Sequence, residues 1–384
     1  MLNDIYIKIA FEFFYRLQRL MINIINFIHE FPAFAVCFSF IIGFCFMPIV
    51  INIAKERNFV VKPNKRTSHQ GVIPNIGGIN IFISFFLTVF IFSYSIISEL
   101  QFTIIGVLII LIIGFVDDLI EIKHYWKFLG ELVSAFFLIV ASDIRLSHLH
   151  GFLGIYELPL WSSYLLSIFV FVVIINALNL IDGVDGLASG LGILYSLFFA
   201  IYFRLTAIYD PSTINLSISA YAMVGSLAVF FIYNVFGGKR KIFMGDSGSL
   251  LLGYMIALYV FKFCDMNAYN LVPTQFKMSA APAVAICVLS VPLFDTLRVM
   301  VTRVKNGVSP FHPDKNHIHH LLLKTGLSHR EVTFVLLIVS LIFISLGIVG
   351  RNWPIIFLVS ISFVLACLLT FILWRIVDKK NTVQ

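Results

Sequence analysis

The sequence predicts an all-α, polytopic membrane protein with about eleven transmembrane helices. Of its 384 residues, 60% are hydrophobic and only 12% are charged, and the mean hydropathy is +0.97. A soluble domain of this size typically carries about 25% charged residues. The apolar runs are continuous over roughly 18–22 residues rather than alternating, which favours helices over a transmembrane barrel, the other fold that lipid tolerates.

One membrane domain, 31–378, is expected to hold all the spans, followed by a short tail, 379–384. Before it, polar residues between positions 5 and 28 recur at spacings of three and four. This pattern predicts that segment 1–30 is an amphipathic helix lying on the membrane surface. The eleven predicted spans lie near 31–53, 76–98, 102–119, 128–142, 160–178, 187–205, 218–236, 248–264, 282–302, 331–350 and 352–375.

The distribution of basic residues predicts the orientation, because cytoplasmic loops are rich in lysine and arginine. Loops after odd-numbered spans carry most of these residues, whereas the alternate loops are poor in them, with Arg145 in one and Lys277 in another. The N-terminus is therefore expected outside and the C-terminus in the cytoplasm. Arg16 and Arg19 in the amphipathic segment would then lie outside, against the rule.

Seven carboxylates stand in four short polar breaks between the apolar runs. All four breaks follow odd-numbered spans, so an orientation that rests on basic residues alone places every one of them on the cytoplasmic side. Acidic groups at the edge of a bilayer are costly and by default mark a functional site. The seven are Asp117, Asp118, Glu121, Asp182, Asp185, Asp246 and Asp314.

The first break reads GFVDDLIEIK. Asp117 and Glu121 are four residues apart and can share one helix face, which suggests a bound cation or cationic ligand between them. Asp118 points about 100° away from its neighbour. A solvated helix end is the simpler interpretation, and the DDxxE spacing is also typical of prenyl diphosphate chemistry through Mg²⁺.

The second break, NALNLIDGVDGLASG, carries a polar stripe in which Asn176, Asn179 and Asp182 follow one another every three residues. A glycine-rich turn containing Asp185 ends the stripe, and glycine lets a backbone turn tightly and approach a ligand. Such a stripe suits a cation with oxygen ligands, or the donors and acceptors of a nucleobase. A capped Asp-Gly turn is the simpler alternative.

In the third break, FMGDSGSL, Asp246 lies between two glycines at the start of a span. An aspartate there can cap the helix, but capping does not explain the three basic residues just before it, 239–241. Free amides at a helix N-terminus beside basic side chains predict a phosphate environment.

The fourth break, SPFHPDKNHIHH, is basic and rich in histidine. His317 and His320 are three residues apart, whereas His319 points elsewhere if the segment is helical. Phosphate binding together with Arg303 and Lys315 is favoured over zinc, because zinc needs further ligands and the cysteines lie in apolar runs. A solvated polar loop is the remaining alternative.

Together the four motifs resemble those of the polyprenyl-phosphate N-acetylhexosamine-1-phosphate transferases, closest to the bacterial undecaprenyl-phosphate GlcNAc-1-phosphate transferase branch. The resemblance extends from KPNKRTSHQGVIPNIGG at 62–78 to HIHH at 317–320. HIHH is similar to the GlcNAc-1-phosphate branch, whereas the peptidoglycan branch generally has three consecutive histidines. Glu121 stands where many relatives have Asp or Asn, and the N-terminal segment is not part of the family pattern.

The resemblance implies transfer of a sugar-1-phosphate from a UDP-sugar to undecaprenyl phosphate with release of UMP. It implies Mg²⁺ or Mn²⁺ as cofactor, an inner-membrane location with the site facing the cytoplasm, and a role in the first membrane step of cell-surface polysaccharide synthesis, and it allows a homodimer. It implies metal ligation by Asp246 and Asn179, catalytic roles for Asp117, Asp118 and Asp182, and substrate contacts by Asn179, Asp185, Phe243, Lys127, Arg303, His317, His319 and His320. Without the resemblance, Phe243 is expected in the core.

Several alternatives are left open. The donor sugar could be a QuiNAc, FucNAc or MurNAc-pentapeptide derivative instead of GlcNAc. A transporter with a relay of buried acids would need acids at mid-span and an inverted repeat, and an aromatic prenyltransferase would need a second aspartate-rich motif, of which NLIDGVDG is a poor copy. The net charge of +7 does not indicate nucleic acid, because the basic residues serve topology. The five cysteines show no CxxC spacing and are expected to be small buried hydrophobes.

Overall fold

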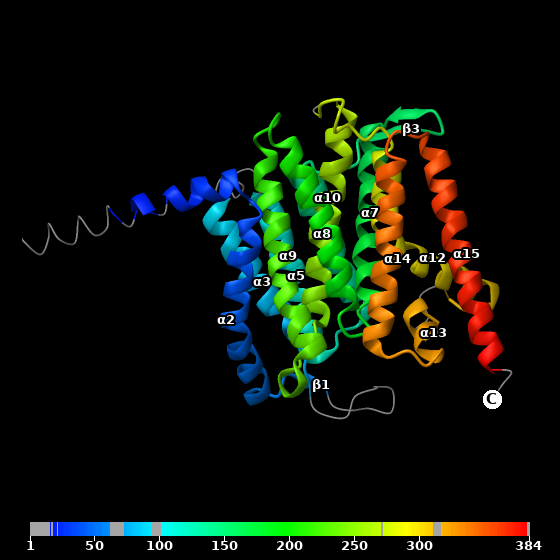
Figure 1. The fold of residues 1–384 in the computed structure, drawn as a ribbon, viewed down its shortest axis with the longest axis horizontal. Helices are drawn as coiled ribbons and strands as arrows, with labels where there is room; N and C mark the ends of the chain where they lie inside the picture. Colours follow the sequence, from blue (N-terminus) through cyan, green and yellow to red (C-terminus); the bar gives the residue numbers. More distant parts are fainter. Residues whose placement is uncertain are drawn as a thin grey trace, which may run out of the picture.

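The computed structural model describes residues 16, 18–20, 22–61, 73–93, 101–269, 272–309 and 316–381. It is a bundle of long helices that run roughly side by side (Figure 1). Asp314, Lys315, the whole KPNKRTSHQ run, most of the N-terminal segment and the last three residues of the tail lie outside the described residues.

Helices dominate the described chain, as the predicted fold class requires. Two short antiparallel hairpins interrupt them: β1 (Val60–Val61) pairs with β2 (Ile73–Pro74), and β3 (His148–Phe152) pairs with β4 (Ile155–Glu157). The helices are α2 Phe34–Glu56, α3 Gly77–Phe92, α5 Gln101–Ile120, α6 His124–Ala135 with its π-helical continuation Phe136–Ala141, α7 Leu160–Leu180, α8 Leu187–Thr206, α9 Thr213–Phe236, the 3₁₀ turn η2 Gly238–Arg240, α10 Gly245–Ala268, α11 Ala281–Val288, α12 Ser290–Lys305, α13 Ile318–Lys324, α14 His329–Val349 and α15 Ile355–Asn381.

Each of the eleven segments predicted as spans is mainly helical over its described residues. Among the described helices, nine are long and apolar enough to cross a membrane, and α3 is shorter, with 16 residues. The segment 282–302, predicted as one span, is divided into α11 and α12, which are bent by 80°. Pro292 explains this break, because proline lacks an N–H and its ring clashes with the carbonyl of Val288 four residues earlier. The chain is thus a multi-pass membrane protein.

Helix α10 forms the centre of the bundle, and nearly all of its residues are buried. It packs against α3, α5, α7 and α8. Its N-terminal turn is approached very closely because two neighbours are glycines. A Cβ on Gly114 would lie 2.6 Å from the backbone nitrogen of Ser247, and a Cβ on Gly78 would overlap Gly248. Through Gly114 the end of α5, and through Gly78 the start of α3, come directly against the start of α10.

The four polar breaks meet at one end of the bundle, the end that carries β1 and α13 in Figure 1. There α5, α7 and α12 end and α6, α8, α10 and α14 begin. The order of the spans therefore gathers breaks from distant parts of the sequence on one face of the molecule.

The described part of the N-terminal segment is helical over residues 22–30 and projects from the opposite end of the bundle, steeply inclined to α2 (Figure 1). His29 Nε2 lies 2.7 Å from the carbonyl oxygen of Phe92, and Arg204 donates to the carbonyl of Glu30 at 3.0 Å. These bonds fix the base of the segment to the bundle, while its placement on a membrane surface stays a prediction.

The expectation for the cysteines is correct for two of the five. Cys264 and Cys287 are buried, whereas Cys37, Cys45 and Cys367 are exposed. The exposed three lie on the outer helices α2 and α15, where an apolar side chain is covered by lipid instead of protein.

Candidate active site

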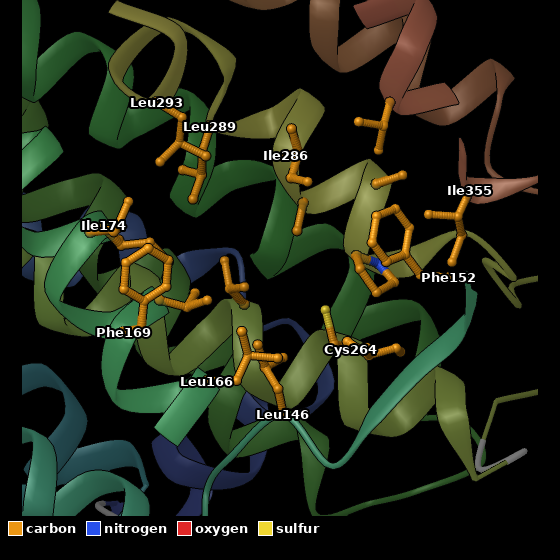
Figure 2. Close-up of a pocket in the computed structure, with 18 residues that line it drawn as sticks. Leu146, Phe152, Leu166, Phe169, Ile174, Cys264, Ile286, Leu289, Leu293 and Ile355 are labelled. Carbon is orange, nitrogen blue, oxygen red and sulfur yellow. The ribbon is translucent and has the colours of Figure 1, made fainter. Parts of the chain in front are cut away.

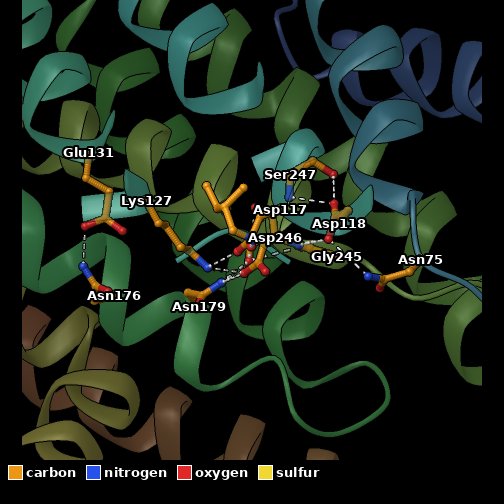
Figure 3. Close-up of polar contacts among 12 residues, drawn as sticks. Asn75, Asp117, Asp118, Lys127, Glu131, Asn176, Asn179, Gly245, Asp246 and Ser247 are labelled. Carbon is orange, nitrogen blue, oxygen red and sulfur yellow. Dashed lines mark hydrogen bonds and ion pairs between the residues drawn. The ribbon is translucent and has the colours of Figure 1, made fainter. Parts of the chain in front are cut away.

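The centre of the site is the carboxylate of Asp246 in the first turn of α10 (Figure 3). Lys127 Nζ on α6 lies 2.6 Å from its Oδ1, and the Asn179 amide nitrogen on α7 donates to the same oxygen. The same ammonium lies 3.1 Å from Asp117 Oδ2 at the end of α5. Asn179 also donates to Ser249 at 2.8 Å. Polar side chains of four helices, α5, α6, α7 and α10, thus meet around Asp246.

The short connection between α5 and α6 places Lys127 there. Helix α5 ends at Ile120, and Glu121 leaves it in the left-handed region with φ of 49°. Asp117 Oδ1 then accepts from the backbone nitrogen of Ile122 at 2.8 Å. The predicted shared helix face of Asp117 and Glu121 is therefore wrong, because the helix ends before Glu121, and the ammonium of Lys127 lies beside Asp117.

Asp118 holds the N-terminus of α10. Its carboxylate accepts from the backbone nitrogens of Asp246 at 2.6 Å and Ser247 at 3.0 Å, from the Ser247 hydroxyl at 2.7 Å and from Asn75 Nδ2 at 3.1 Å. A carboxylate is a favourable partner for the free amides and positive dipole end of a helix. Two of the amides expected to be free for phosphate, those of Asp246 and Ser247, are therefore occupied by Asp118.

Gly245 makes this capping arrangement sterically possible. Its φ is 71°, and a Cβ added there would lie 2.5 Å from Asp118 Oδ2. Any side chain at this position would be strained and would push the capping carboxylate away.

Asp182 lies in the turn between α7 and α8. Burial, followed by the negative charges of Asp246, Asp118 and Asp185, raises the pKa of Asp182 well above its usual range. This carboxyl group therefore keeps its proton to a higher pH than an ordinary aspartate.

Asp185, in the same turn, is an acceptor for cations. Lys241 Nζ lies 2.6 Å from Asp185 Oδ2, and His329 Nδ1 of α14 lies 3.4 Å from the same atom. Burial alone would raise the pKa of Asp185, but these two partners hold it below its usual range. Lys241 Nζ also lies 5.5 Å from the centroid of the Phe243 ring. Phe243 is only half-buried, so it is not the core residue that its pattern alone suggests.

The histidine motif is organised by Asp295, a buried acid of α12. Asp295 Oδ2 lies 2.9 Å from His317 Nδ1, and its Oδ1 accepts from the backbone nitrogen of Ile318 at 2.9 Å and from Arg298 at 2.8 Å. Arg298 also donates to the carbonyl of Asn316. One carboxylate thereby holds the first residues of α13 against α12.

His319 faces the turn that carries the two aspartates. A Cβ on Gly183 would lie 2.8 Å from its Nε2, its ring is parallel to that of His317 at 5.6 Å, and the His320 ring lies 4.3 Å away on its other side. Burial, then the neighbouring His320, lowers the pKa of His319 to about 3. His319 is therefore neutral near pH 7, so it can donate or accept a hydrogen bond to a phosphate but does not supply positive charge. Arg303, also predicted to contact phosphate, is buried near the end of α12.

A divalent cation fits at Asp246 by donor chemistry. The ammonium 2.6 Å from its Oδ1 marks a place where this pocket accepts positive charge, and Asp117 supplies a second carboxylate beside it. Mg²⁺ typically takes one or two carboxylates and fills its remaining positions with water and phosphate oxygens. Asn179 directs its amide nitrogen toward Asp246, whereas a metal ion would bind its amide oxygen. Within the described ranges, no three His, Cys, Asp or Glu side chains form a ready metal cluster, so phosphate oxygens would have to complete the coordination.

The sequence patterns missed several residues of this end of the bundle. Glu131 and Asp295 are single acids inside apolar segments, and the rule that a charge within a span is functional would have found both. The same rule applies to Arg298, which lies three residues after Asp295, whereas no sequence signal identifies Asn75 or His329, because their partners come from distant parts of the chain.

Comparisons with known proteins agree with this site. The family model described as Glycosyl transferase family 4 matches residues 100–264. A protein of Escherichia coli O157:H7 named undecaprenyl-phosphate alpha-N-acetylglucosaminyl 1-phosphate transferase is 30% identical, and the match covers 82% of this chain and 84% of that protein. A Bacillus subtilis (strain 168) protein named probable undecaprenyl-phosphate N-acetylglucosaminyl 1-phosphate transferase is 34% identical over 82% of this chain and 84% of its own length. This chain therefore belongs to the same family, glycosyl transferase family 4, as these undecaprenyl-phosphate N-acetylglucosaminyl 1-phosphate transferases.

Proposed function

We propose that this protein transfers N-acetylglucosamine-1-phosphate from UDP-N-acetylglucosamine to undecaprenyl phosphate and releases UMP. The observation that carries the proposal is the convergence of Lys127, Asp117 and Asn179 on Asp246 at the end of a membrane bundle. This arrangement suits a diphosphate that arrives from water and an acceptor that arrives from lipid. The names of the relatives select N-acetylglucosamine among the UDP-sugars.

The reaction forms one phosphorus–oxygen bond and breaks another. An oxygen of the lipid phosphate attacks the β-phosphorus of the UDP-sugar, and the bond from that phosphorus to the bridging oxygen breaks, so UMP leaves with the bridging oxygen. Two anions meet and negative charge grows on the leaving group, so catalysis depends mainly on positioning and positive charge. A Mg²⁺ or Mn²⁺ ion bound through Asp246 and Asn179 would supply Lewis-acid neutralisation of the diphosphate.

The remaining roles follow from the contacts of each side chain. Lys127 brings a positive charge to the meeting point of the two phosphates, and Asp117 holds it there. Asp118 acts on Asp246 through the N-terminus of α10, which makes it a positioning residue in this proposal. Asp182, with its raised pKa, can hold a proton beside the phosphates.

The nucleotide is assigned to the pocket formed by Asp185, Lys241 and Phe243. The ring and the carboxylate provide a stacking surface and an acceptor for a base, and Lys241 lies against both. The neutral His319 faces the turn that carries Asp182 and Asp185, and His317 is held by Asp295. Both histidines are assigned to the diphosphate.

An apolar cavity supports the assignment of a polyprenyl phosphate as the acceptor (Figure 2). Its volume is about 290 Å³, and it is lined almost entirely by hydrocarbon, from Leu146 and Phe152 at one end to Ile174 and Leu293 at the other. The last two residues precede Asn176 and Asp295 by two positions each. A polyprenyl chain in this cavity would therefore have its phosphate end directed toward the polar site.

The topology of the proposal has eleven spans, counting α3 and the bent pair α11–α12, with the N-terminus outside and the C-terminus in the cytoplasm. The basic residues at the site end of the bundle support this orientation. The proposed location is the inner membrane with the site facing the cytoplasm. The proposed role is the first membrane step of cell-surface polysaccharide synthesis, such as O-antigen.

The test is a panel of UDP-sugars with purified protein, undecaprenyl phosphate and Mg²⁺. We expect UMP and a lipid-linked sugar diphosphate, detected by chromatography and mass spectrometry, with UDP-N-acetylglucosamine as the best donor. Asp246→Ala should lose at least about 100-fold of the rate, because it removes the centre of the site. Absence of product with every UDP-N-acetylhexosamine would refute the enzyme assignment, whereas a better rate with another donor would refute only the sugar.

A further inference from the structure

Glu131 is a buried acid that the proposed mechanism does not use. It lies on α6 with an exposed fraction of 1%, inside a helix that is apolar enough to cross a membrane. A carboxylate in such surroundings is costly unless it is paired, and acids retained within spans usually serve function.

The partner of Glu131 is Asn176 on α7. The Asn176 amide nitrogen donates to Glu131 Oε2 at 2.6 Å and to the carbonyl oxygen of Val172, one turn earlier in its own helix, at 3.0 Å. Both hydrogens of the amide are therefore engaged, so its orientation is fixed. The pair forms a direct polar link between α6 and α7.

This link repeats, one helical turn deeper, the link made through Asp246. Glu131 follows Lys127 by four residues on α6, and Asn176 precedes Asn179 by three residues on α7, so each pair shares one helix face. Lys127 and Asn179 both contact Oδ1 of Asp246. Figure 3 shows the two links side by side, Glu131 with Asn176 and Lys127 with Asn179.

We propose that Glu131 is a positioning residue for the reaction assigned above, an inference that rests on the proposed function. Its bond to Asn176 sets the spacing and rotation of α6 against α7, and thereby delivers Lys127 and Asn179 to a single oxygen of Asp246. Glu131 itself contacts none of the reacting groups. Partners that orient groups around a metal or phosphate site typically contribute about 10- to 100-fold to affinity or rate.

The test compares Glu131→Ala, Glu131→Gln and Asn176→Ala in the purified protein. We expect the alanine variants to lower kcat about 10- to 100-fold with a smaller change in the KM for the UDP-sugar. The affinity for Mn²⁺, measured by electron paramagnetic resonance in the presence of UDP-N-acetylglucosamine and without undecaprenyl phosphate, should fall by a similar factor. Glu131→Gln should recover most of both, because its carbonyl oxygen can accept from Asn176. The double alanine variant should be no worse than either single variant, because both remove the same link.

Asn267 offers a matched control at the other end of α10. It is also 1% exposed, and its amide nitrogen donates to Tyr202 at 2.7 Å and to the carbonyl of Phe263, one turn earlier, at 2.8 Å. Asn267→Ala therefore removes the same two donated bonds far from the site, together with the bond that the backbone nitrogen of Met278 donates to its Oδ1 at 2.8 Å. It should lower thermal stability while leaving kcat and Mn²⁺ affinity unchanged.

Each outcome decides one of the two ideas. Wild-type kcat in Glu131→Ala overturns the positioning role, as does an equal loss of kcat in Asn267→Ala, which would indicate a general effect of lost stability. A wild-type protein without transferase activity would overturn the proposed function instead. In that case a loss of Mn²⁺ affinity in Glu131→Ala and Asn176→Ala alone would still support the positioning role, and unchanged affinity would overturn it.

Discussion

Asp118 gives the sharpest test of how the site is built. Two adjacent aspartates invite the interpretation that both act on substrate, but within the described residues the hydrogen bonds of Asp118 join it to the start of α10 and to Asn75. Asp118→Ala should therefore reduce stability as well as activity.

The size of the effect follows from the bonds that are lost. Two backbone amides of α10 would lose their acceptor, and a half-buried donor left unpaired costs about 1 kcal/mol at the lower end of the usual range. The Ser247 hydroxyl can rotate to another acceptor, so we count only the amides and expect a loss of about 2 kcal/mol. Asp118→Asn should lose about half as much, because its oxygen can still accept while its NH₂ group faces donors.

Unfolding free energies are measured by detergent titration in mixed micelles, in parallel with the transferase assay. Glu121→Ala is the control, because Glu121 is exposed just beyond the same helix and should change stability by no more than about 0.5 kcal/mol. Wild-type stability of Asp118→Ala together with lost activity would refute the capping role and return Asp118 to the chemical step.

Three further perturbations test other parts of the site. Because the pKa of Asp182 is raised, the folded protein retains a proton that the unfolded chain releases. The stabilisation from this group is complete below its ordinary pKa of 3.8 and is lost as the pH rises through the raised value. In EDTA, the Tm of Asp182→Asn should therefore exceed that of the wild type by a margin that grows as the pH rises above 3.8; a constant difference would contradict the raised pKa. Gly183→Ala should lower kcat about 10- to 100-fold, because its Cβ would lie 2.8 Å from His319 Nε2; an unchanged kcat with an unchanged Tm would exclude His319 from the reaction. Ser328→Ala breaks the capping box with Glu331 at the start of α14 and should cost about 1 kcal/mol of stability with an unchanged kcat; an unchanged Tm would show that the box does not stabilise α14.

The fold was largely predictable, because span length and continuous apolar runs determine helices in lipid. The gathering of the polar breaks at one end was predictable too, since the order of spans sends alternate loops to the same side. The bend of α11–α12 escaped the prediction although Pro292 signals it. A hydropathy window averages the proline with its apolar neighbours and therefore predicts one continuous span. In the structure, the proline interrupts the hydrogen bonding of the helix.

The partners within the site were not predictable from the sequence. That Asp118 caps α10 depends on Gly114 and Gly78, which let α5 and α3 approach that helix, and glycine alone does not reveal which helix will approach. Glu131 is a single acid inside an apolar run, so it lies in none of the polar breaks that predict the site. Its role depends on the contact with Asn176 of the next helix, which only the folded structure reveals.

The ammonium of Lys127 between two carboxylates also determines how strongly this place attracts ions. With Lys127 in place, the Asp117–Asp246 pair carries a net charge of −1 instead of −2, and attraction scales with the product of the charges. The Coulomb attraction for any further cation is therefore about half of what two carboxylates without the ammonium would exert. Lys127 thus acts as a built-in counterion, which lets the two acids lie close together without a bound ion.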